Sequence, residues 1–151
     1  MSIAVTPASV GDLPALVELL SILFSIEQDF QPDAEKQARG LAMLLARPEN
    51  GVILVARHSE AGVVGMVSVQ LVISTASGAP SAWIEDVVIR PACRSAGLGR
   101  RLLDAARDWA SSRGAGRLQL LADADNVPAL GFYTHLGWQP TRLFAWRKFP
   151  G

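Results

Sequence analysis

The sequence predicts an α/β fold with a mixed central β-sheet flanked by helices, and three observations support it. The expected strands (β) and helices (α) follow the order β, α, α, β, β, β, α, β, α, β. Half of the 151 residues are hydrophobic, enough for a sizeable core without disulfides or metal. No repeat or low-complexity linker interrupts the sequence. We therefore expect a single domain over residues 1–151.

The first 50 residues predict one strand and two helices. Residues 3–6 are typical of a short strand, and Asp12 can cap a helix that has Pro14 in its first turn. A second helix is expected over residues 33–46, where the pair Arg47-Pro48 ends it. The apolar positions of the first helix follow helical spacing: Leu13, Leu16, Val17, Leu20, Leu23 and Phe24.

The middle of the chain predicts three strands. Residues 52–57 and 63–73 are rich in β-branched side chains and are joined by a short turn. A loop is expected over residues 75–81 because it is rich in Ser, Gly and Pro. A third strand follows over residues 83–90.

The last third predicts two helices separated by a strand. The first helix presents one apolar face and ends at Gly114, and a strand follows over residues 117–122. Asn126 can cap a short helix through residue 135. Residues 138–149 have room for a final strand or two. The apolar face consists of Leu98, Leu102, Ala105, Ala106 and Trp109.

Composition narrows the class of protein. The formal net charge is zero, which argues against a general nucleic-acid binder. The single cysteine, Cys93, cannot form an internal disulfide. No signal peptide and no apolar run near the ~20 residues of a membrane span are found, so we expect a cytoplasmic protein with no membrane partner.

The charges are unevenly distributed. Residues 1–80 hold four basic and eight acidic side chains, whereas residues 81–151 hold ten basic and six acidic ones. This pattern suits an anionic ligand at the second half and a cationic one near the first. Attraction between the two halves explains it as well.

Glycines and arginines are concentrated over residues 94–103, at the expected start of a helix. The first N–H groups of a helix lack partners and carry partial positive charge, and glycines let an anion approach them. Arg94, Arg100 and Arg101 add planar donors, so a diphosphate would suit this loop; a tight turn without a ligand is the alternative. No glycine precedes a lysine, as a P-loop requires, and Leu102 stands where a Rossmann motif needs its third glycine.

Two motifs carry a family resemblance. Arg94-x-x-Gly97-x-Gly99 resembles the pyrophosphate-binding motif of the GCN5-related N-acetyltransferases (GNAT family). The preceding segment, 87–91, is similar to that family's central strand. The run from Asn126 through Tyr133 to Gly137-Trp138 resembles its second signature, a short helix ending in Tyr-x-x-x-Gly-aromatic. The likeness covers nearly the whole chain.

This resemblance implies a GNAT-like fold with a splayed opening that holds acetyl-CoA. Its pantetheine arm would pair with the strand at Val87, Val88 and Ile89, where a bulge leaves the Val88 N–H to polarise the thioester carbonyl. Asn126 would contact the same arm. Ser95 stands where the family usually has glycine, but it still offers its N–H group. The diphosphate would lie against Arg94, Ser95, Ala96, Gly97, Leu98, Gly99 and Arg100.

Glu85 is the expected general base. An alkyl amine has a pKa near ~10.4, so only about one molecule in 10³ is neutral at pH 7. A carboxylate in an otherwise apolar strand is costly unless it is paired or exposed in a cleft. The Ile-Glu-Asp-Val-Val pattern of residues 84–88 is similar to that of family members that act on amino sugars and polyamines. A structural carboxylate is the alternative. Strict alternation would place Glu85 and Asp86 on opposite faces of the sheet.

Tyr133 matches the family's general acid, which would protonate the departing thiolate of coenzyme A. Packing against Phe132 and Trp138 is the alternative role. Neither histidine belongs to a recognised metal or nucleophile motif, and no metal site is expected.

The acceptor site is expected at the joint between the first two helices, where Glu27, Asp29 and Phe30 would suit an amine-bearing cation. An exposed acidic loop is the alternative. The resemblance thus implies direct acetyl transfer from acetyl-CoA to a small cationic or amino-sugar-like amine. A peptide or protein amine, or a non-catalytic acyl-CoA sensor, are the alternatives. A homodimer is the assembly of many relatives.

Overall fold

The computed structural model describes residues 2–27 and 29–151. It divides into two compact units, residues 1–120 and 121–151, which we describe separately. The strands are β1 (Ile3–Pro7), β2 (Gly51–His58), β3 (Gly62–Ser74), β4 (Ala79–Ile89) and β5 (Arg117–Leu120). The helices are α1 (Leu13–Ile26), α2 (Ala34–Leu45), α3 (Leu98–Ser112) and α4 (Val127–His135), with short 3-10 turns at Val10–Asp12 and Pro91–Cys93.

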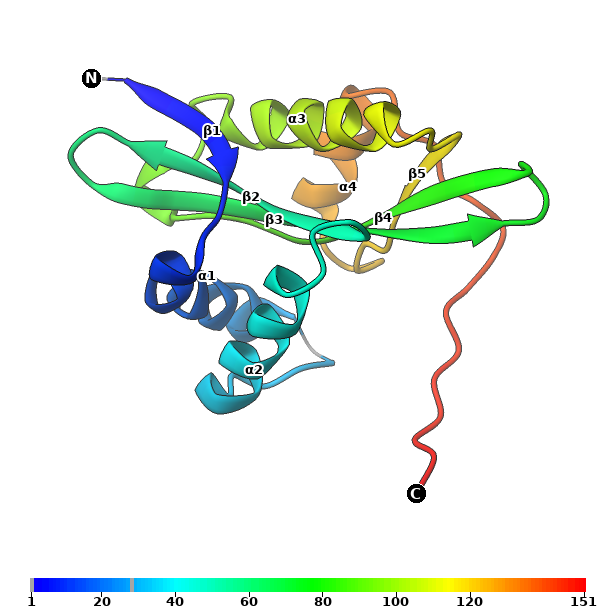
Figure 1. The fold of residues 1–151 in the computed structure, drawn as a ribbon, viewed down its shortest axis with the longest axis horizontal. Helices are drawn as coiled ribbons and strands as arrows, with labels where there is room; N and C mark the ends of the chain where they lie inside the picture. The colour runs from blue at the N-terminus through cyan, green and yellow to red at the C-terminus, as the bar shows by residue number, and fades with distance from the viewer. Residues whose placement is uncertain (1, 28) are drawn as a thin grey trace. The chain divides into compact units, whose positions relative to one another are not determined.

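The first unit is built on one five-stranded sheet in the order β1-β2-β3-β4-β5 (Figure 1). Neighbouring strands are antiparallel from β1 to β4, and β5 runs parallel to β4. The parallel pair is possible because α3 carries the chain back across the sheet between β4 and β5. The predicted α/β class with a mixed sheet is confirmed.

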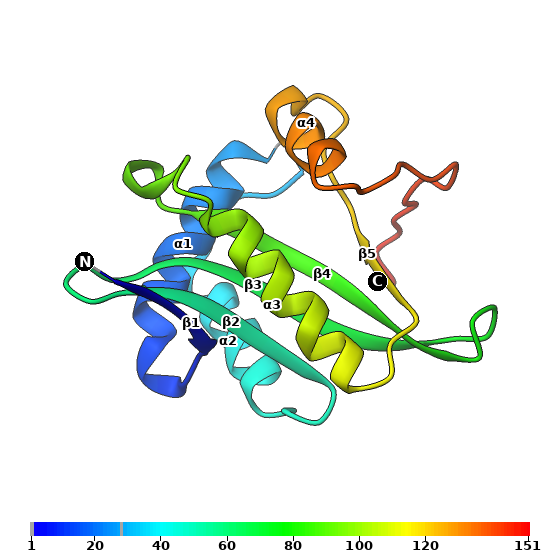
Figure 2. The ribbon, with the colours of Figure 1, turned by 90° about the horizontal axis from the view of Figure 1, so that it is seen from above.

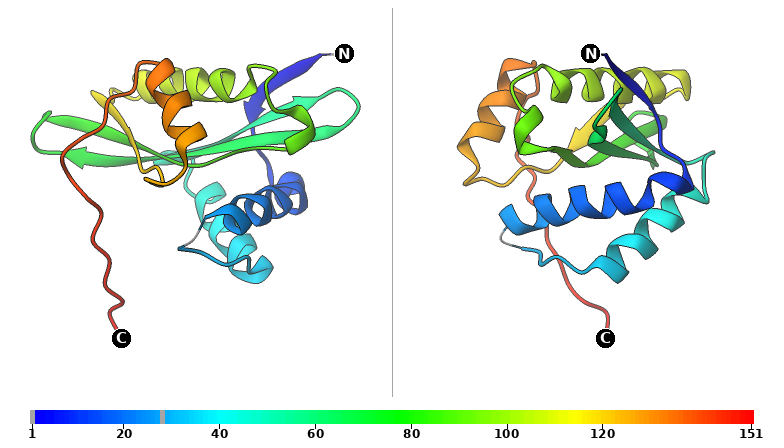
Figure 3. Two further views of the ribbon diagram at one scale, coloured as in Figure 1. Left: turned by 180° about the vertical axis from the view of Figure 1, so that it is seen from behind. Right: turned by 90° about the vertical axis from the view of Figure 1, so that its left-hand side faces the viewer.

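Helices cover both faces of this sheet. Helices α1 and α2 lie together on one face, and α3 crosses the other, as the views from above and from the side show (Figures 2 and 3). Side chains from α1, α2 and three strands form one core on the first face, and the apolar stripe of α3 is buried on the second. The first core contains Leu16, Leu19, Leu20, Leu41, Ile53, Val55, Val63, Met66 and Val88.

The start of α1 is tied to the sheet rather than simply capped. Asp12 occupies the N-cap position, but its side chain does not cap α1. Its carboxylate accepts two hydrogen bonds from the Arg57 guanidinium, both 3.0 Å, and one from the Ser9 amide at 2.9 Å. The bond from Arg57 is the main cause that lowers the pKa of Asp12 below its usual value. This pair fixes the first helix against β2.

Two expectations about strands were wrong. β4 begins at Ala79, earlier than expected, so the hairpin turn is only four residues long. Residues 138–149 form no strand in the described chain. A strand needs a partner for its backbone groups, and the unit 121–151 contains one helix and no other described strand.

The second unit contains α4 and the segment that follows it. Asn126 caps α4 as expected, since its side-chain oxygen accepts a hydrogen bond from the Ala129 amide at 3.2 Å. Several large apolar side chains after residue 142 are exposed: Leu143, Phe144, Trp146 and Phe149. Over residues 2–27 and 29–151, no helix has the length and apolar character to cross a bilayer.

Candidate functional site

Strands β4 and β5 separate partway along their length. Their pairing ends at Ile84 and Leu120, whereas β4 continues to Ile89. The edge of β4 from Glu85 to Ile89 therefore has no strand beside it within the described chain. An extended chain could pair with this free edge by adding as a strand. The segment 87–89, for which the resemblance implied this role, lies on it.

A β-bulge lies at the start of this free edge. Ser68 of β3 pairs with Glu85, and Met66 pairs with Val88, so two residues of β4 oppose the single Val67. Asp86 is the first of them, and its φ of 56° lies in the left-handed region. The bulge interrupts the alternation of side chains. Glu85 and Asp86 consequently line the same pocket, which corrects the expectation of opposite faces.

Asp86 lies in a partly buried environment that favours its neutral form. The Ser68 hydroxyl, itself buried, lies 3.1 Å from Asp86 Oδ2 and 3.1 Å from the Glu85 carbonyl oxygen. Burial, and then the neighbouring Glu85 charge, raise the pKa of Asp86 to about 6, against the opposing hydrogen bond from Ser68. A carboxyl with this pKa is mostly ionised at pH 7 and still able to accept a proton.

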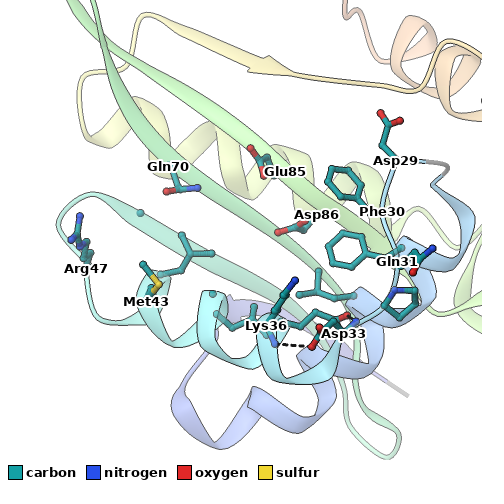
Figure 4. A pocket seen from close by; sticks show the side chains of 18 of the residues that line it. Asp29, Phe30, Gln31, Asp33, Lys36, Met43, Arg47, Gln70, Glu85 and Asp86 are labelled. Atoms are coloured by element: carbon teal, nitrogen blue, oxygen red, sulfur yellow. Dashed lines mark hydrogen bonds between the residues drawn. The ribbon is translucent and has the colours of Figure 1, made fainter. Parts of the chain in front are cut away.

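The pocket that these carboxylates line lies between α2 and the sheet and has a volume of about 750 Å³ (Figure 4). One face of α2 forms a wall with Lys36, Gly40 and Met43, and Arg47, just after the helix, continues this helical spacing. Gly40 leaves this wall open, because a Cβ atom there would meet nothing within 4 Å. The other lining residues are Leu20, Phe24, Asp29, Phe30, Gln31, Pro32, Asp33, Gln37, Leu41, Leu44, Asn50, Gly51 and Gln70.

Two of the three residues predicted for the acceptor site line this pocket. Asp29 and Phe30 belong to the joint between α1 and α2, and the Phe30 ring lies 5.5 Å from the Phe24 ring. Glu27 is the C-cap of α1 and is not among the described residues that line the pocket. The wall of α2 was not predicted, although its spacing of four, three and four residues could have indicated it.

The glycine-rich loop ends at α3 with unpaired amides. Gly97 is the N-cap and has φ 76°, a left-handed conformation that glycine adopts without strain. Within the described chain, the amides of residues 95–100 donate no hydrogen bond to protein acceptors. Six successive donors at a helix N-terminus make a site for an anion. Leu98 is buried and anchors this turn.

Of the three arginines in this segment, Arg94 and Arg100 are exposed near the loop, whereas Arg101 binds the sheet. Arg94 is exposed, and its Nε donates to the Ile89 carbonyl oxygen at 3.1 Å, which leaves its terminal nitrogens for a ligand. Arg100 is exposed on the first turn of α3, 4.0 Å from Asp104. Arg101 instead donates to the Ile3 carbonyl oxygen of β1 at 2.9 Å. Arg101 therefore links α3 to the sheet rather than standing free at the loop.

The Ser95→Gly variant is expected to raise the melting temperature. Ser95 has φ 68°, a left-handed conformation that costs about 1–2 kcal/mol for a residue with a side chain. Glycine removes this strain but adds freedom to the unfolded chain, so we expect a net gain of about 1 kcal/mol or less. Thermal unfolding measures the change; a lower melting temperature would show that the Ser95 side chain stabilises the loop.

These features fit the acetyl-CoA that the resemblance implies. The loop amides and Arg94 suit a diphosphate, and the free edge of β4 suits the amide-containing pantetheine arm. In the second unit, Tyr133 packs against Phe132 and Trp138, with ring centroids 5.4 and 6.1 Å away. Both expected residues of that unit, Asn126 and Tyr133, lie on or beside α4.

Comparisons with known proteins relate this chain to N-acetyltransferases. The chain is 31% identical over 119 residues to the uncharacterized N-acetyltransferase YhfO of Bacillus subtilis, covering 78% of this chain and 79% of that protein. It is 41% identical over 63 residues to streptothricin acetyltransferase of Streptomyces lavendulae, covering 38% and 33%. It thus spans about a third of the length of the curated relatives matched at 44% and 41% identity.

The fold and the family are also matched. A putative acetyltransferase from Agrobacterium tumefaciens has a solved structure that superimposes with a TM-score of 0.80 at 27% identity, covering 96% of this chain and 99% of that one. Residues 13–138 match the acetyltransferase (GNAT) family. This chain therefore belongs to the acetyltransferase (GNAT) family.

Proposed function

We propose that this protein transfers an acetyl group from acetyl-CoA to the amine of a small molecule. The position of Glu85 and Asp86 supports this most. Both residues line the pocket and both lie where β4 loses its neighbouring strand. A carboxylate that can take up a proton is thus present where the pocket for the amine meets the free edge of β4.

Binding of acetyl-CoA would use main-chain groups of the first unit. The amides of residues 95–100, with Arg94, would hold the diphosphate, and residues 87–89 would pair with the pantetheine arm. Asn126 is proposed to contact the same arm while capping α4. Bound acetyl-CoA supplies an acetyl group activated as a thioester. Because Asn126 and Tyr133 belong to the second unit, residues 1–151 would act as one N-acetyltransferase domain.

The two carboxylates would have different roles toward the amine: one accepts its proton and the other attracts its charge. Asp86, with its pKa raised to about 6, accepts a proton from the bound ammonium, and the neutral amine that results is the nucleophile. Glu85 is the more exposed of the two, and its negative charge attracts the ammonium and raises the pKa of Asp86. Two adjacent carboxyl groups in different environments suit separate roles. The amine attacks directly, without a covalent protein intermediate.

The Tyr133→Phe variant is expected to lower kcat by roughly 10²-fold while the affinity for acetyl-CoA stays near the wild-type value. Tyr133 is proposed to protonate the departing thiolate, and general acid–base groups contribute effects of this size. The phenylalanine ring keeps the packing against Phe132 and Trp138. An unchanged kcat, with chemistry rate-limiting, would leave Tyr133 as a packing residue.

The pocket and one relative favour a small acceptor. A volume of about 750 Å³ is typical of sites for compact ligands, and the streptothricin relative is named for a small molecule. The test is thiol release from acetyl-CoA with a panel of amines and of lysine-containing peptides. Turnover with peptides alone would favour a protein acceptor. Binding of acetyl-CoA without any turnover would favour the non-catalytic sensor.

A homodimer is proposed from the exposed apolar side chains of the second unit. Leu143, Phe144, Trp146 and Phe149 are 74–95% exposed, and association would remove them from water. Light scattering of the purified chain tests this: a monomer mass at high concentration would exclude it.

A further inference from the structure

One end of the pocket carries a cation without a protein partner. Arg47 follows α2, and its carbonyl oxygen accepts hydrogen bonds from the amides of Asn50 at 3.0 Å and Gly51 at 3.1 Å. The main chain therefore fixes its position. The guanidinium is exposed, lines the pocket and forms no ion pair or hydrogen bond within residues 2–27 and 29–151.

Two side chains that line the pocket with Arg47 offer amide donors. The side-chain amides of Asn50 and Gln70 also line the pocket, and neither forms a hydrogen bond with other described residues. Figure 4 places Arg47, Met43 and Gln70 toward one side, Asp29 and Phe30 toward the other, and Asp86 between them. The acidic lining residues thus lie away from Arg47, whereas Lys36, the other cationic lining residue, lies beside Asp33. Arg47 is the cation at the end of the pocket away from the carboxylates.

The register of the sheet gives the separation of Glu85 from Gly51, whose amide donates to the Arg47 carbonyl oxygen. Gly51 pairs with Gln70, and Gln70 pairs with Trp83, two residues before Glu85. Two strand spacings and two residues along a strand amount to roughly 12 Å. A compact molecule could therefore span from the carboxylates to Arg47, with its body passing the open wall at Gly40.

We propose that the acceptor carries an anionic group, a carboxylate or a phosphate, that Arg47 binds while its amine lies at Glu85 and Asp86. A guanidinium fork with nearby amide donors suits both anions. A polyamine of that length would place its second ammonium against Arg47 and be repelled. This inference rests on the proposed function and narrows its substrate class from cations to amines that carry both charges.

The experiment compares acceptors that differ by one anionic group: lysine with cadaverine, and glucosamine 6-phosphate with glucosamine. Thiol release gives kcat/KM for each. We expect the wild type to prefer the anionic member by about tenfold or more at low salt, and less as ionic strength rises. The lysine pair tests for a carboxylate preference, and the glucosamine pair tests for a phosphate preference.

Arg47→Met is expected to abolish this preference, and Arg47→Glu to reverse it. Arg39→Met is the matched control, because Arg39 is exposed on α2 and is not among the lining residues. Arg47 also lies at the C-terminal end of α2, where a cation stabilises a helix. That role alone would change the melting temperature of Arg47→Met but not the preference.

Two results would overturn the inference: a wild type that prefers cadaverine and glucosamine, or an Arg47→Met variant that keeps the anionic preference. Failure of the proposed function looks different. In that case acetyl-CoA binds by calorimetry, but no amine of either kind supports thiol release, and the inference falls with it.

Discussion

The Asp86→Asn variant is expected to lose about 10²-fold or more in kcat/KM near pH 7.5 and to unfold at a higher temperature than the wild type. The loss follows from removing the proposed base, since general bases contribute about 10²–10⁴-fold. The gain follows from replacing a partly buried ionised carboxylate by a neutral amide of the same shape. Asparagine also tolerates the left-handed backbone at this position.

The size of the stability gain depends on pH. The pKa of Asp86 is raised from 3.8 to about 6 on folding, so the folded state binds more protons than the unfolded state between these values. The stabilising contribution of the protonated carboxyl is complete below pH 3.8 and is lost as the pH rises through about 6. At pH 8 this amounts to on the order of 3 kcal/mol, or roughly 5–10 °C in Tm. Below pH 3.8 the two melting temperatures should differ little.

Glu85→Gln is the matched control, because it changes the adjacent carboxylate of the same bulge. Removing its charge lowers the pKa of Asp86, so the acid limb of kcat/KM near pH 6 should move to lower pH. The rate at pH 8 should stay within about tenfold of the wild type. If Glu85→Gln abolishes turnover at pH 8 and Asp86→Asn does not, Glu85 is the base, as the sequence alone suggested.

Gly97→Asp is expected to weaken acetyl-CoA binding by about 10²-fold or more. The added carboxylate would stand among the amides of residues 95–100 and repel the diphosphate, and aspartate would strain a backbone with φ 76°. Titration calorimetry with acetyl-CoA measures the affinity.

Gly78→Asp is the control that separates repulsion of the diphosphate from backbone strain. Gly78 lies in the turn between β3 and β4 and has φ 62°, and a Cβ atom there would meet no heavy atom within 4 Å, as is also true at Gly97. Both variants should therefore lose similar stability, but only Gly97→Asp should lose affinity. Equal affinity in the two folded variants would remove the loop from the cofactor site.

Much of the fold could be predicted from local patterns. Helical spacing of apolar residues indicated α1 and α3, and β-branched runs indicated β2 and β3, each within a few residues of the observed bounds. The glycines of the loop were also informative, since Gly97 needs the left-handed conformation that only glycine adopts freely. Such features depend on neighbours in sequence, and the sequence displays them directly.

The site was less predictable because it depends on pairing between distant residues. The bulge at Asp86 arises from the register of β4 against β3, and it placed two adjacent carboxylates in one pocket against the expected alternation. Arg101 looked like a third phosphate ligand, but its partner is a carbonyl of β1, 98 residues away. Neither fact is visible in the local sequence.

The glycine in the wall of α2 has a consequence for how this protein could change. Glycine within a helix lowers stability by roughly 0.5–1 kcal/mol relative to alanine, and Gly40 has open space where a side chain would stand. Most substitutions that alter a binding site weaken the fold, which limits how many can accumulate. Replacement of Gly40 by alanine or a larger residue would both narrow the pocket and stabilise α2. A lineage could therefore move from bulkier to smaller acceptors by a single step that selection for stability does not oppose.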